Sequence, residues 1–352
     1  MAERLPADVR AANFKQLTRR NWQALGTKSN DGAGGSSIFE LPRARLLAGL
    51  RILIETTLTA THASDNTVDA GDLAPYSLVK KILLNLNNGF APIELTGGNL
   101  YALQTTLNGT VVSAPETSGR GRAVLGLTAS SGGTANVVRL ELDVPTEVNP
   151  RDPVGLILLQ NVDTLATLEV QTGAAADIAE LSGGTVALGS VSVTVLTDTY
   201  SIPADPNAVP DISILKSYKG RSESLQSGEN VIKLPVGQTY RKLWFIVRNA
   251  SGVRQADSFI TSPIELVLDQ NEAPYKVPAK ILAGENTKDY DGALPDGMYV
   301  FDFATAGDAR NLASSRDLID TQRITEFWLR FSTSAAGTIE YGYETLSKMA
   351  GL

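Results

Sequence analysis

The chain has 352 residues, of which 43% are hydrophobic, a formal net charge of −7 and no cysteine. This length accommodates two domains, and the lack of cysteine excludes disulfides, thiol catalysis and thiolate metal sites. The acidic balance argues against a general nucleic-acid binder, which would present a strongly basic face. No apolar run approaches 18 residues and the start lacks the apolar core of a signal peptide, so we expect cytoplasmic synthesis and no transmembrane helix.

The N-terminal segment is basic although the chain as a whole is acidic. Residues 1–30 carry a net charge of +4, and the remaining residues carry −11. Apolar residues three apart beside a basic face predict one amphipathic helix over residues 5–25, ended by Gly26. Residues 27–37 offer almost nothing to bury, so we expect a flexible tether. The predicted N-terminal arm comprises residues 1–35.

From Ile38 onward the apolar residues follow a period of two, which is typical of half-buried strands. One predicted strand places a set of side chains on its inner face, namely Leu50, Ile52, Ile54, Thr56 and Leu58, with Arg51, Glu55 and Thr57 opposite. Another places Val138, Leu140, Leu142 and Val144 inward and Arg139, Glu141 and Asp143 outward. Further strands are expected at 78–86, 91–95, 156–159, 165–170 and 186–195, with a helix at 99–107. Residues 108–136 are expected to form a long loop or a weakly ordered hairpin.

The segment 203–210 contains three prolines and cannot remain in a strand ladder, so it is expected to link two domains. The predicted first domain covers 36–202, and the second covers 211–352 with a short C-terminal tail. Strands of the second domain are expected at 212–215, 231–234, 243–247, 264–268, 275–282, 298–303, 324–331 and 339–343. We also expect an exposed loop at 283–297 and a helix at 308–320.

An internal echo connects the two halves. The stretch 39–57 (FELPRARLLAGLRILIETT) resembles 231–247 (VIKLPVGQTYRKLWFIV) at a constant offset of 193 residues. Both copies have an apolar approach to Leu-Pro, seven intervening residues and a strand of large apolar side chains. Because proline has no N–H for a strand ladder, a Leu-Pro at the same place in both halves indicates the same corner built twice.

About eight short strands in each half, joined by Gly, Pro and Asn turns, predict an all-β protein with a sandwich or barrel in each half. The strand number suits a jelly roll, although the count alone does not separate it from an immunoglobulin-like sandwich. The predicted fold is therefore two tandem eight-stranded jelly-roll barrels with an N-terminal amphipathic helix.

Residues that could carry chemistry are few. His62 is the only histidine, which excludes any mechanism or metal site that needs two. No nucleophile elbow, phosphate loop or dinucleotide fingerprint is present. The acidic loop 65–72, with Asp65, Asp69 and Asp72, resembles a calcium loop only faintly because its spacing fails, and Asp289, Asp291 and Asp296 form a second acidic loop. We therefore expect no catalytic residue, no metal site, no cofactor and no enzyme activity.

The basic arm has two interpretations. Its apolar side chains could dock on a neighbouring subunit, or the helix could lie on an anionic lipid surface. The residues proposed to face a membrane or a neighbour are Arg10, Phe14, Lys15, Leu17, Arg19, Arg20 and Trp22. One arm would bind lipid weakly, whereas many copies in one shell would bind firmly.

The order of six segments resembles the double jelly-roll major capsid proteins of tailless icosahedral phages with an internal membrane, the tectivirus type. These segments are 38–60, 77–103, 191–203, 233–243, 293–303 and 339–349. The resemblance implies a homotrimer that forms a pseudo-hexagonal tile of an icosahedral virion shell, with the N-terminal helix on the inner, membrane side. It also implies minor capsid and vertex proteins as partners, and no sequence-specific nucleic acid.

Two other functions remain open from the sequence. A carbohydrate-binding or glycan-cleaving double β-sandwich would need a cleft with stacked aromatics, yet aromatic residues are only 6% of the chain and do not cluster. A cellular scaffold or adhesin is weakened by the lack of a secretion signal.

Overall fold

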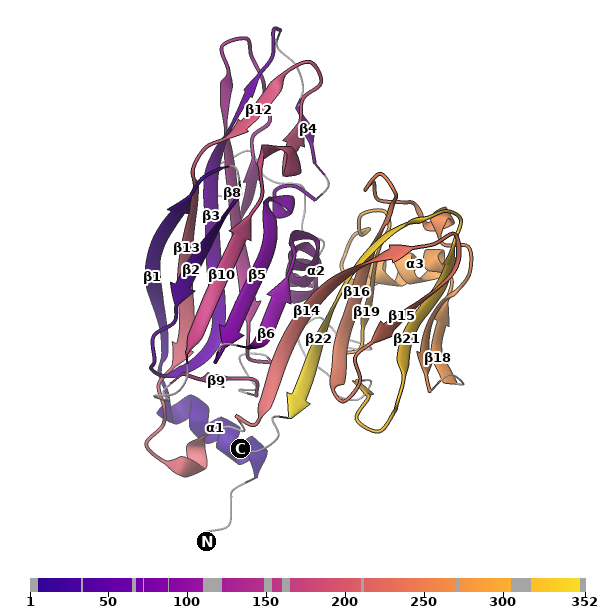
Figure 1. The fold of residues 1–352 in the computed structure, drawn as a ribbon. Coiled ribbons are helices and arrows are strands. Elements are labelled where there is room, and N and C mark those ends of the chain that lie inside the picture. Colours follow the sequence, from indigo (N-terminus) through magenta and orange to yellow (C-terminus); the bar gives the residue numbers. More distant parts are fainter. Residues whose placement is uncertain are drawn as a thin grey trace. The chain divides into compact units, whose positions relative to one another are not determined.

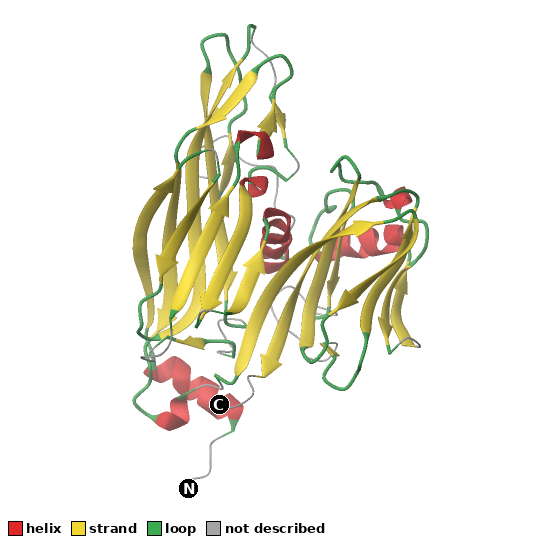
Figure 2. Ribbon diagram, in the orientation of Figure 1, coloured by secondary structure: helices red, strands yellow, loops and turns green. Residues whose placement is uncertain are grey.

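The computed structural model describes residues 6–32, 34–64, 68–71, 73–87, 89–109, 122–148, 154–159, 165–209, 212–269, 272–304 and 318–348. Strands dominate these residues, with three α-helices among them (Figure 2). The chain forms two compact units. Unit 1 comprises Met1–Gly97, Ala114–Ser217 and Lys348–Leu352, and unit 2 comprises Gly98–Ser113 and Tyr218–Ser347. Within the described ranges, no helix is both long and apolar enough to cross a bilayer.

Unit 1 contains two main sheets (Figure 1). The first has the order β1 (Arg20–Asn30), β13 (Val191–Tyr200), β3 (Leu46–Thr61), β8 (Thr134–Pro145) and β7 (Ala123–Leu125), and β3 also pairs with β9 (Ile157–Leu158) and β12 (Thr185–Leu188). The second has the order β6 (Phe90–Leu95), β5 (Val79–Leu86), β10 (Ala166–Thr172) and β2 (Gly35–Glu40). A small pair joins β4 (Asp69–Ala70) and β11 (Ala179–Glu180).

Unit 2 is also built from two four-stranded sets. One has the order β14 (Ile214–Leu225), β22 (Gly337–Lys348), β16 (Thr239–Asn249) and β19 (Met298–Asp302), with β20 (Ile319–Asp320) also on β16. The other has the order β15 (Gly228–Leu234), β21 (Phe327–Thr333), β17 (Ile264–Leu268) and β18 (Glu272–Val277). The helices are α1 (Ala7–Leu17), α2 (Gly97–Asn108) and α3 (Ala279–Asp289), and the 3-10 turns are η1 (Tyr76–Leu78), η2 (Ala175–Asp177), η3 (Pro206–Ala208) and η4 (Asp257–Phe259).

The two units repeat one topology. In chain order, β1, β2, β3, β5, β6, α2, β8, β10 and β13 correspond to β14, β15, β16, β17, β18, α3, β19, β21 and β22. In both, the first strand lies beside the last, the last beside the third, and the third beside β8 in unit 1 or β19 in unit 2. Eight antiparallel strands in two such sheets form a jelly roll, so the predicted fold class is confirmed.

The predicted internal repeat is confirmed by the backbone. Leu41-Pro42 follows β2 and Leu234-Pro235 ends β15, and the next strands are β3 and β16. Each of these strands carries a bulge opposite its last-strand partner, at Ala48 in β3 and Arg241 in β16. The two bulges are separated by the same 193 residues as the Leu-Pro pairs. The pairing of β3 with β13 therefore corresponds residue by residue to the pairing of β16 with β22.

The predicted inner faces are also confirmed. The side chains of Leu50, Ile52, Ile54 and Leu58 are buried, as are Val138, Leu140, Leu142 and Val144. In unit 2 the core is richer in aromatic rings, for example Phe245, which stacks 6.0 Å from Phe331. Burial of these side chains is the main stabilising contribution of each sandwich.

The helix predicted over residues 5–25 is too long. The helix ends at Leu17, and residues 20–30, assigned to the helix and tether, form strand β1 on β13. Gly26 does not end a helix; it adopts φ +99° where the register shifts between Ala24 and Gly26. Ten paired residues on β13, over 160 positions away in sequence, outweigh the local helical pattern.

The segment after β18 also differs from the prediction. The strand expected over 275–282 ends at Val277, and α3 covers much of the expected loop at 283–297. Leu282 is buried in the core, and the Asn286 amide donates to the Val300 carbonyl oxygen at 2.7 Å and accepts from its N–H at 2.9 Å. These contacts with the edge of β19 hold the helix in place.

Three further expectations concern the helix at 99–107, the segment 108–136 and the helix at 308–320. The helix at 99–107 is confirmed as α2. Of the loop or hairpin expected at 108–136, residues 110–121 lie outside the described residues, and 123–125 form a strand that pairs antiparallel with β8, which begins at Thr134. The helix at 308–320 falls mostly on residues outside the description, and Ile319–Asp320 is strand β20.

The boundary between the units falls after Ser217, beyond the proline-rich segment at which the sequence places it. One reason is that the buried Lys216 donates a short hydrogen bond to the Glu147 carbonyl oxygen within unit 1. Whether residues 203–210 act as a linker stays a prediction.

Helix α2 packs on the outer face of the unit 2 sheet that contains β16 and β22. The Asn99 side chain accepts a hydrogen bond from Trp244 Nε1 at 2.7 Å and donates to Glu340 Oε1 at 3.3 Å. Gly342 leaves the space for this pair, because a Cβ there would lie 2.2 Å from Asn99 Oδ1 and 2.5 Å from Trp244 Nε1. We call these interactions the α2 contact.

We expect Gly342→Ala to lower the free energy of unfolding by about 1–3 kcal/mol, because the methyl group overpacks a buried, hydrogen-bonded pair. Denaturant unfolding measures the difference. Gly132→Ala is the matched control, since a Cβ at that exposed glycine meets nothing within 4 Å. Equal stability of the two variants would contradict the packing described for the α2 contact.

Candidate assembly surface

The arm residues named from the sequence do not form one surface. Phe14 is 1% exposed and packs in unit 1 with Leu46, Ala48 and Leu156. Its ring lies 5.2 Å from that of Tyr200 in an edge-to-face arrangement. Arg10 is also buried, and its Nη1 donates to the Val209 carbonyl oxygen at 3.4 Å. These two residues therefore anchor α1 to its own unit.

Three of the named residues remain accessible beside the helix. Lys15, Leu17 and Arg19 are exposed, with Leu17 at 56%. Because Leu17 and the two cations lie at or just beyond the end of α1, they form a small basic surface with one apolar residue. We call Lys15, Leu17 and Arg19 the basic tip.

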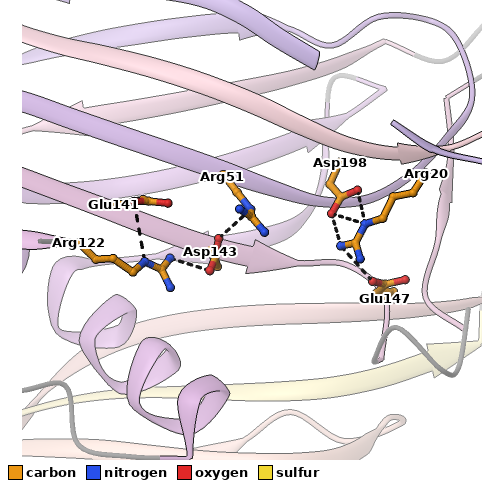
Figure 3. A network of polar contacts seen from close by, with 7 residues as sticks. All are labelled: Arg20, Arg51, Arg122, Glu141, Asp143, Glu147 and Asp198. Atoms are coloured by element: carbon orange, nitrogen blue, oxygen red, sulfur yellow. Dashed lines mark hydrogen bonds and ion pairs between the residues drawn. The ribbon is translucent and has the colours of Figure 1, made fainter. Parts of the chain in front are cut away.

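Arg20 and Trp22 lie on strand β1 and not on a helix. Arg20 Nε donates to both carboxylate oxygens of Asp198 on β13, at 2.8 and 3.0 Å, and its Nη2 lies 3.9 Å from Glu147 (Figure 3). The Arg20 guanidinium also lies over two aromatic rings, 5.9 Å from Trp22 and 5.8 Å from Tyr200. The hydrogen bonds with Asp198 raise the pKa of Arg20 above its ordinary value.

A second set of charges continues across the same sheet. Arg51 Nε lies 3.3 Å from Asp143, which also binds Arg122 Nη2 at 2.6 Å, and Arg122 Nε is 3.9 Å from Glu141 (Figure 3). Arg51 stacks 4.4 Å from the Trp22 ring, so this aromatic residue joins the two sets. Trp22 is nevertheless 54% exposed. We call the outer face of β1, β13, β3 and β8 the Trp22 face.

Glu147 is the least satisfied charge of this network. Its side chain is 4% exposed, and burial raises its pKa to about 7, with Asp198 adding to the rise while Arg20 and Lys216 oppose it. Tyr200 hydrogen-bonds Glu147, and burial together with that carboxylate raises the pKa of Tyr200 to about 12. Tyr200 also packs against Phe14, so Glu147 lies next to the position where α1 is anchored.

Nothing in the described residues assembles a reaction centre. His62 Nδ1 lies 2.6 Å from the Ser64 carbonyl oxygen within its own turn. Among the described residues, no group of three acidic, histidine or cysteine side chains is placed to hold a metal ion. Of the acidic loop 65–72, residues 65–67 and 72 lie outside the description.

The sequence reasoning missed Asp198 and Glu147 as members of a site. The alternation correctly placed Arg51, Glu141 and Asp143 on an outer face, but it carried no information on their partners. The signal that could have found Asp198 is the repeat itself. Asp198 lies opposite Gly49 in unit 1, and Glu344 lies opposite the corresponding residue, Lys242, in unit 2. Both acids pair with an arginine, since Glu344 lies 2.7 Å from Arg241.

We expect the Glu147→Gln variant to be more stable than the parent protein at pH 8 by about 1–3 kcal/mol and to lose this advantage at pH 5. The pKa of Glu147 is raised from 4.5 to about 7, so ionisation in the folded state lowers stability as pH rises through that interval. Thermal unfolding at both pH values measures the difference.

The control variant is Glu141→Gln, which also removes a carboxylate from the network but at a more exposed side chain. A stability difference between Glu147→Gln and the parent that stays constant from pH 5 to pH 8 would contradict the assignment.

No protein-family model and no curated protein matches this sequence. Solved structures match over nearly the whole chain. The MCP of STIV, the Sulfolobus turreted icosahedral virus, has a TM-score of 0.70 at 16% identity and covers 95% of this chain and 100% of that one. The PBCV-1 virus capsid structure has a TM-score of 0.62 at 10% identity, covering 95% of both chains. The major capsid protein P2 of bacteriophage PM2 has a TM-score of 0.54 at 14% identity, covering 94% of this chain and 98% of that one.

These matches span both units, and both units have the strand order of a jelly roll. The chain therefore has the double jelly-roll fold of the major capsid proteins of icosahedral viruses.

Proposed function

We propose that this chain is a viral major capsid protein that assembles with copies of itself into an icosahedral shell. The observation that carries the proposal is the double jelly-roll fold, which matches viral coat proteins over 94–95% of this chain and 95–100% of theirs. The identities of 10–16% are low, so the proposal rests on the fold and on the surfaces of this chain.

The internal repeat suits a tile. Three chains with two similar barrels each approximate sixfold packing, so a homotrimer presents a pseudo-hexagonal outline to its neighbours. The strands of each barrel are buried against each other, and the loops are free to vary. We propose such a homotrimer in the virion shell, with neighbouring trimers, minor capsid proteins and vertex proteins as partners.

A structural role also agrees with the chemistry of the chain. The single histidine is bonded within its own turn, and the charges of the Trp22 face are paired across strands. The alternative of a carbohydrate-binding or glycan-cleaving sandwich gains no support from the matched structures, which come from viral coats. We propose that the protein is not an enzyme.

The basic tip is the part of the arm that could face the inside of the shell or an internal membrane. Lys15, Leu17 and Arg19 are exposed, whereas Phe14 and Arg10 are buried in unit 1. Each basic residue near an anionic surface contributes about 1 kcal/mol, so a single chain binds lipid weakly. A shell with many copies gains firm attachment through avidity.

Assembly of the purified protein tests the proposed function. Light scattering coupled to gel filtration is expected to give a stable homotrimer, and electron microscopy at higher concentration is expected to show tiles or shells. A strictly monomeric protein at all concentrations would contradict the proposal.

For the basic tip, we expect the charge reversals Lys15→Glu and Arg19→Glu together to reduce binding of assembled protein to anionic lipid vesicles at least tenfold, because attraction becomes repulsion. Vesicle co-sedimentation measures this. The charge-matched control is Lys233→Glu with Arg323→Glu, both exposed in unit 2. Equal loss of binding in both variants would show a general charge effect and remove the assignment.

A further inference from the structure

Helix α1 is anchored to unit 1 through a small pocket. Phe14 packs with the buried Leu46, Ala48 and Leu156, and its ring lies 5.2 Å from that of Tyr200. We call these four residues around Phe14 the Phe14 pocket. Burial of an aromatic ring contributes strongly to packing, so the position of α1 depends on this pocket staying closed.

Glu147 is connected to two residues of the Phe14 pocket. Its carboxylate is hydrogen-bonded by Tyr200, and its backbone N–H donates to the Ala48 carbonyl oxygen at 3.1 Å. The neighbouring Thr146 N–H donates to the same Ala48 oxygen at 2.8 Å. A change in the charge of Glu147 therefore arises directly beside the residues that hold Phe14.

The groups that face Glu147 do not fully offset the burial of its carboxylate. Arg20 Nη2 on β1 lies 3.9 Å away, and Arg20 Nε already donates to both carboxylate oxygens of Asp198 on β13 (Figure 3). Lys216 on β14 donates to the main-chain carbonyl oxygen of Glu147. Burial raises the pKa of Glu147 to about 7, with Arg20, Lys216 and Tyr200 opposing the rise and Asp198 adding to it. Ionisation therefore costs free energy as long as the carboxyl stays buried.

The chain can pivot between α1 and β1. Thr18 separates the two elements and has an extended backbone, with φ −114° and ψ 157°. The next residue, Arg19, is fixed, because its N–H donates to Ser201 Oγ at 2.9 Å and its carbonyl oxygen accepts from the Ser201 N–H at 3.0 Å. Strand β1 then pairs with β13 along its length. The helix can thus leave the Phe14 pocket while β1 stays paired.

We propose that ionisation of Glu147 releases α1 from the Phe14 pocket, so that the helix pivots at Thr18 and exposes Phe14 beside the basic tip. With the Glu147 carboxyl protonated, the pocket stays closed and Phe14 remains an internal anchor. The released helix presents an apolar ring together with Lys15 and Arg19, a combination that binds anionic lipid surfaces. The lipid step rests on the proposed function, whereas the release of the helix does not.

The pH dependence of the release follows from proton binding in the two states. The closed state binds the Glu147 proton with a pKa of about 7, and the released state binds it with the ordinary pKa of 4.5. The equilibrium constant for release therefore increases as pH rises between these two values, by about 70-fold from pH 5 to pH 8, and levels off above about pH 7.

Hydrogen exchange of the full chain measures this release. After correction for the intrinsic exchange rate, we expect the protection of the α1 amides at residues 11–17 to fall by about 70-fold from pH 5 to pH 8. Glu147→Gln is expected to show no such fall, because its side chain is neutral throughout, and the control Glu141→Gln is expected to keep it. Phe14→Ala is expected to lower the protection at both pH values, because it removes the anchor itself.

Vesicle co-sedimentation separates the release from the lipid step. With phosphatidylserine vesicles at pH 8, we expect the assembled parent protein to bind about tenfold more tightly than Glu147→Gln, and we expect this difference to be largely lost at pH 5. Equal exchange behaviour of the parent and Glu147→Gln at both pH values would overturn the release but leave the proposed function standing. Release without a difference in vesicle binding would overturn the lipid step. A parent protein that never assembles would overturn the proposed function, while the exchange experiment still decides on the release.

Discussion

Each β-sandwich in this chain has two outer faces, and every such face must either be polar or be covered. Main-chain pairing and inward apolar side chains stabilise the sandwiches, but they do not determine what surrounds the outward-facing side chains of each strand. The protein meets this requirement in different ways. Unit 2 covers one face with α2 and keeps the other polar, where Glu265 lies between Lys276 at 2.8 Å and Arg330 at 2.5 Å. Unit 1 keeps the Trp22 face polar by pairing arginines with acids across strands.

Covering a face changes what its charges require. In the unit 2 sheet Arg241 and Glu344 pair at 2.7 Å, and Lys242 pairs with Asp302 at 3.0 Å while it also donates to the Thr106 carbonyl oxygen of α2. Both pairs are almost fully buried, so each charge needs its partner and its hydrogen bonds to offset desolvation. Glu147 in unit 1 is also buried, but Arg20 Nη2 lies 3.9 Å away, and burial raises the pKa of Glu147 to about 7.

The sequence predicts best what is local and repeated. Alternation identified the inner and outer residues of β3 and β8, and the Leu-Pro echo identified corresponding strands before any partner was known. Prediction from the sequence failed where pairing with a distant strand decides the local structure. Residues 20–25 continue a helical pattern, yet their backbone pairs with β13; Gly284 and the polar sequence around it suggest a loop, yet Asn286 and Leu282 fix α3 on β19 and the core.

The assembly surface was predictable only in part for the same reason. The apolar and basic residues of the arm were recognised, but which are free depends on the pocket formed by Leu46, Ala48 and Leu156 from other strands. Phe14 fills that pocket, so a residue named for an external role is an internal anchor. The pairing of Arg51 with Asp143 likewise depends on strand register, which alternation alone does not set.

Two similar helices and two similar sheet faces in one chain create a problem of choice, because α2 and α3 could compete for the same face. The differences between the repeats resolve it. Asn99 and Ile281 are each the third residue of their helix, so with α3 in the place of α2 the Trp244 Nε1 group would lose its buried acceptor. If α2 lay on the Trp22 face, the Asn99 amide would be pressed against Leu196, which fills the position of Gly342. Each mismatch leaves a buried polar group unpaired, and this penalty favours α2 over α3 on the unit 2 face. Divergence of the two halves at Asn99 and Gly342 therefore determines which helix covers that face.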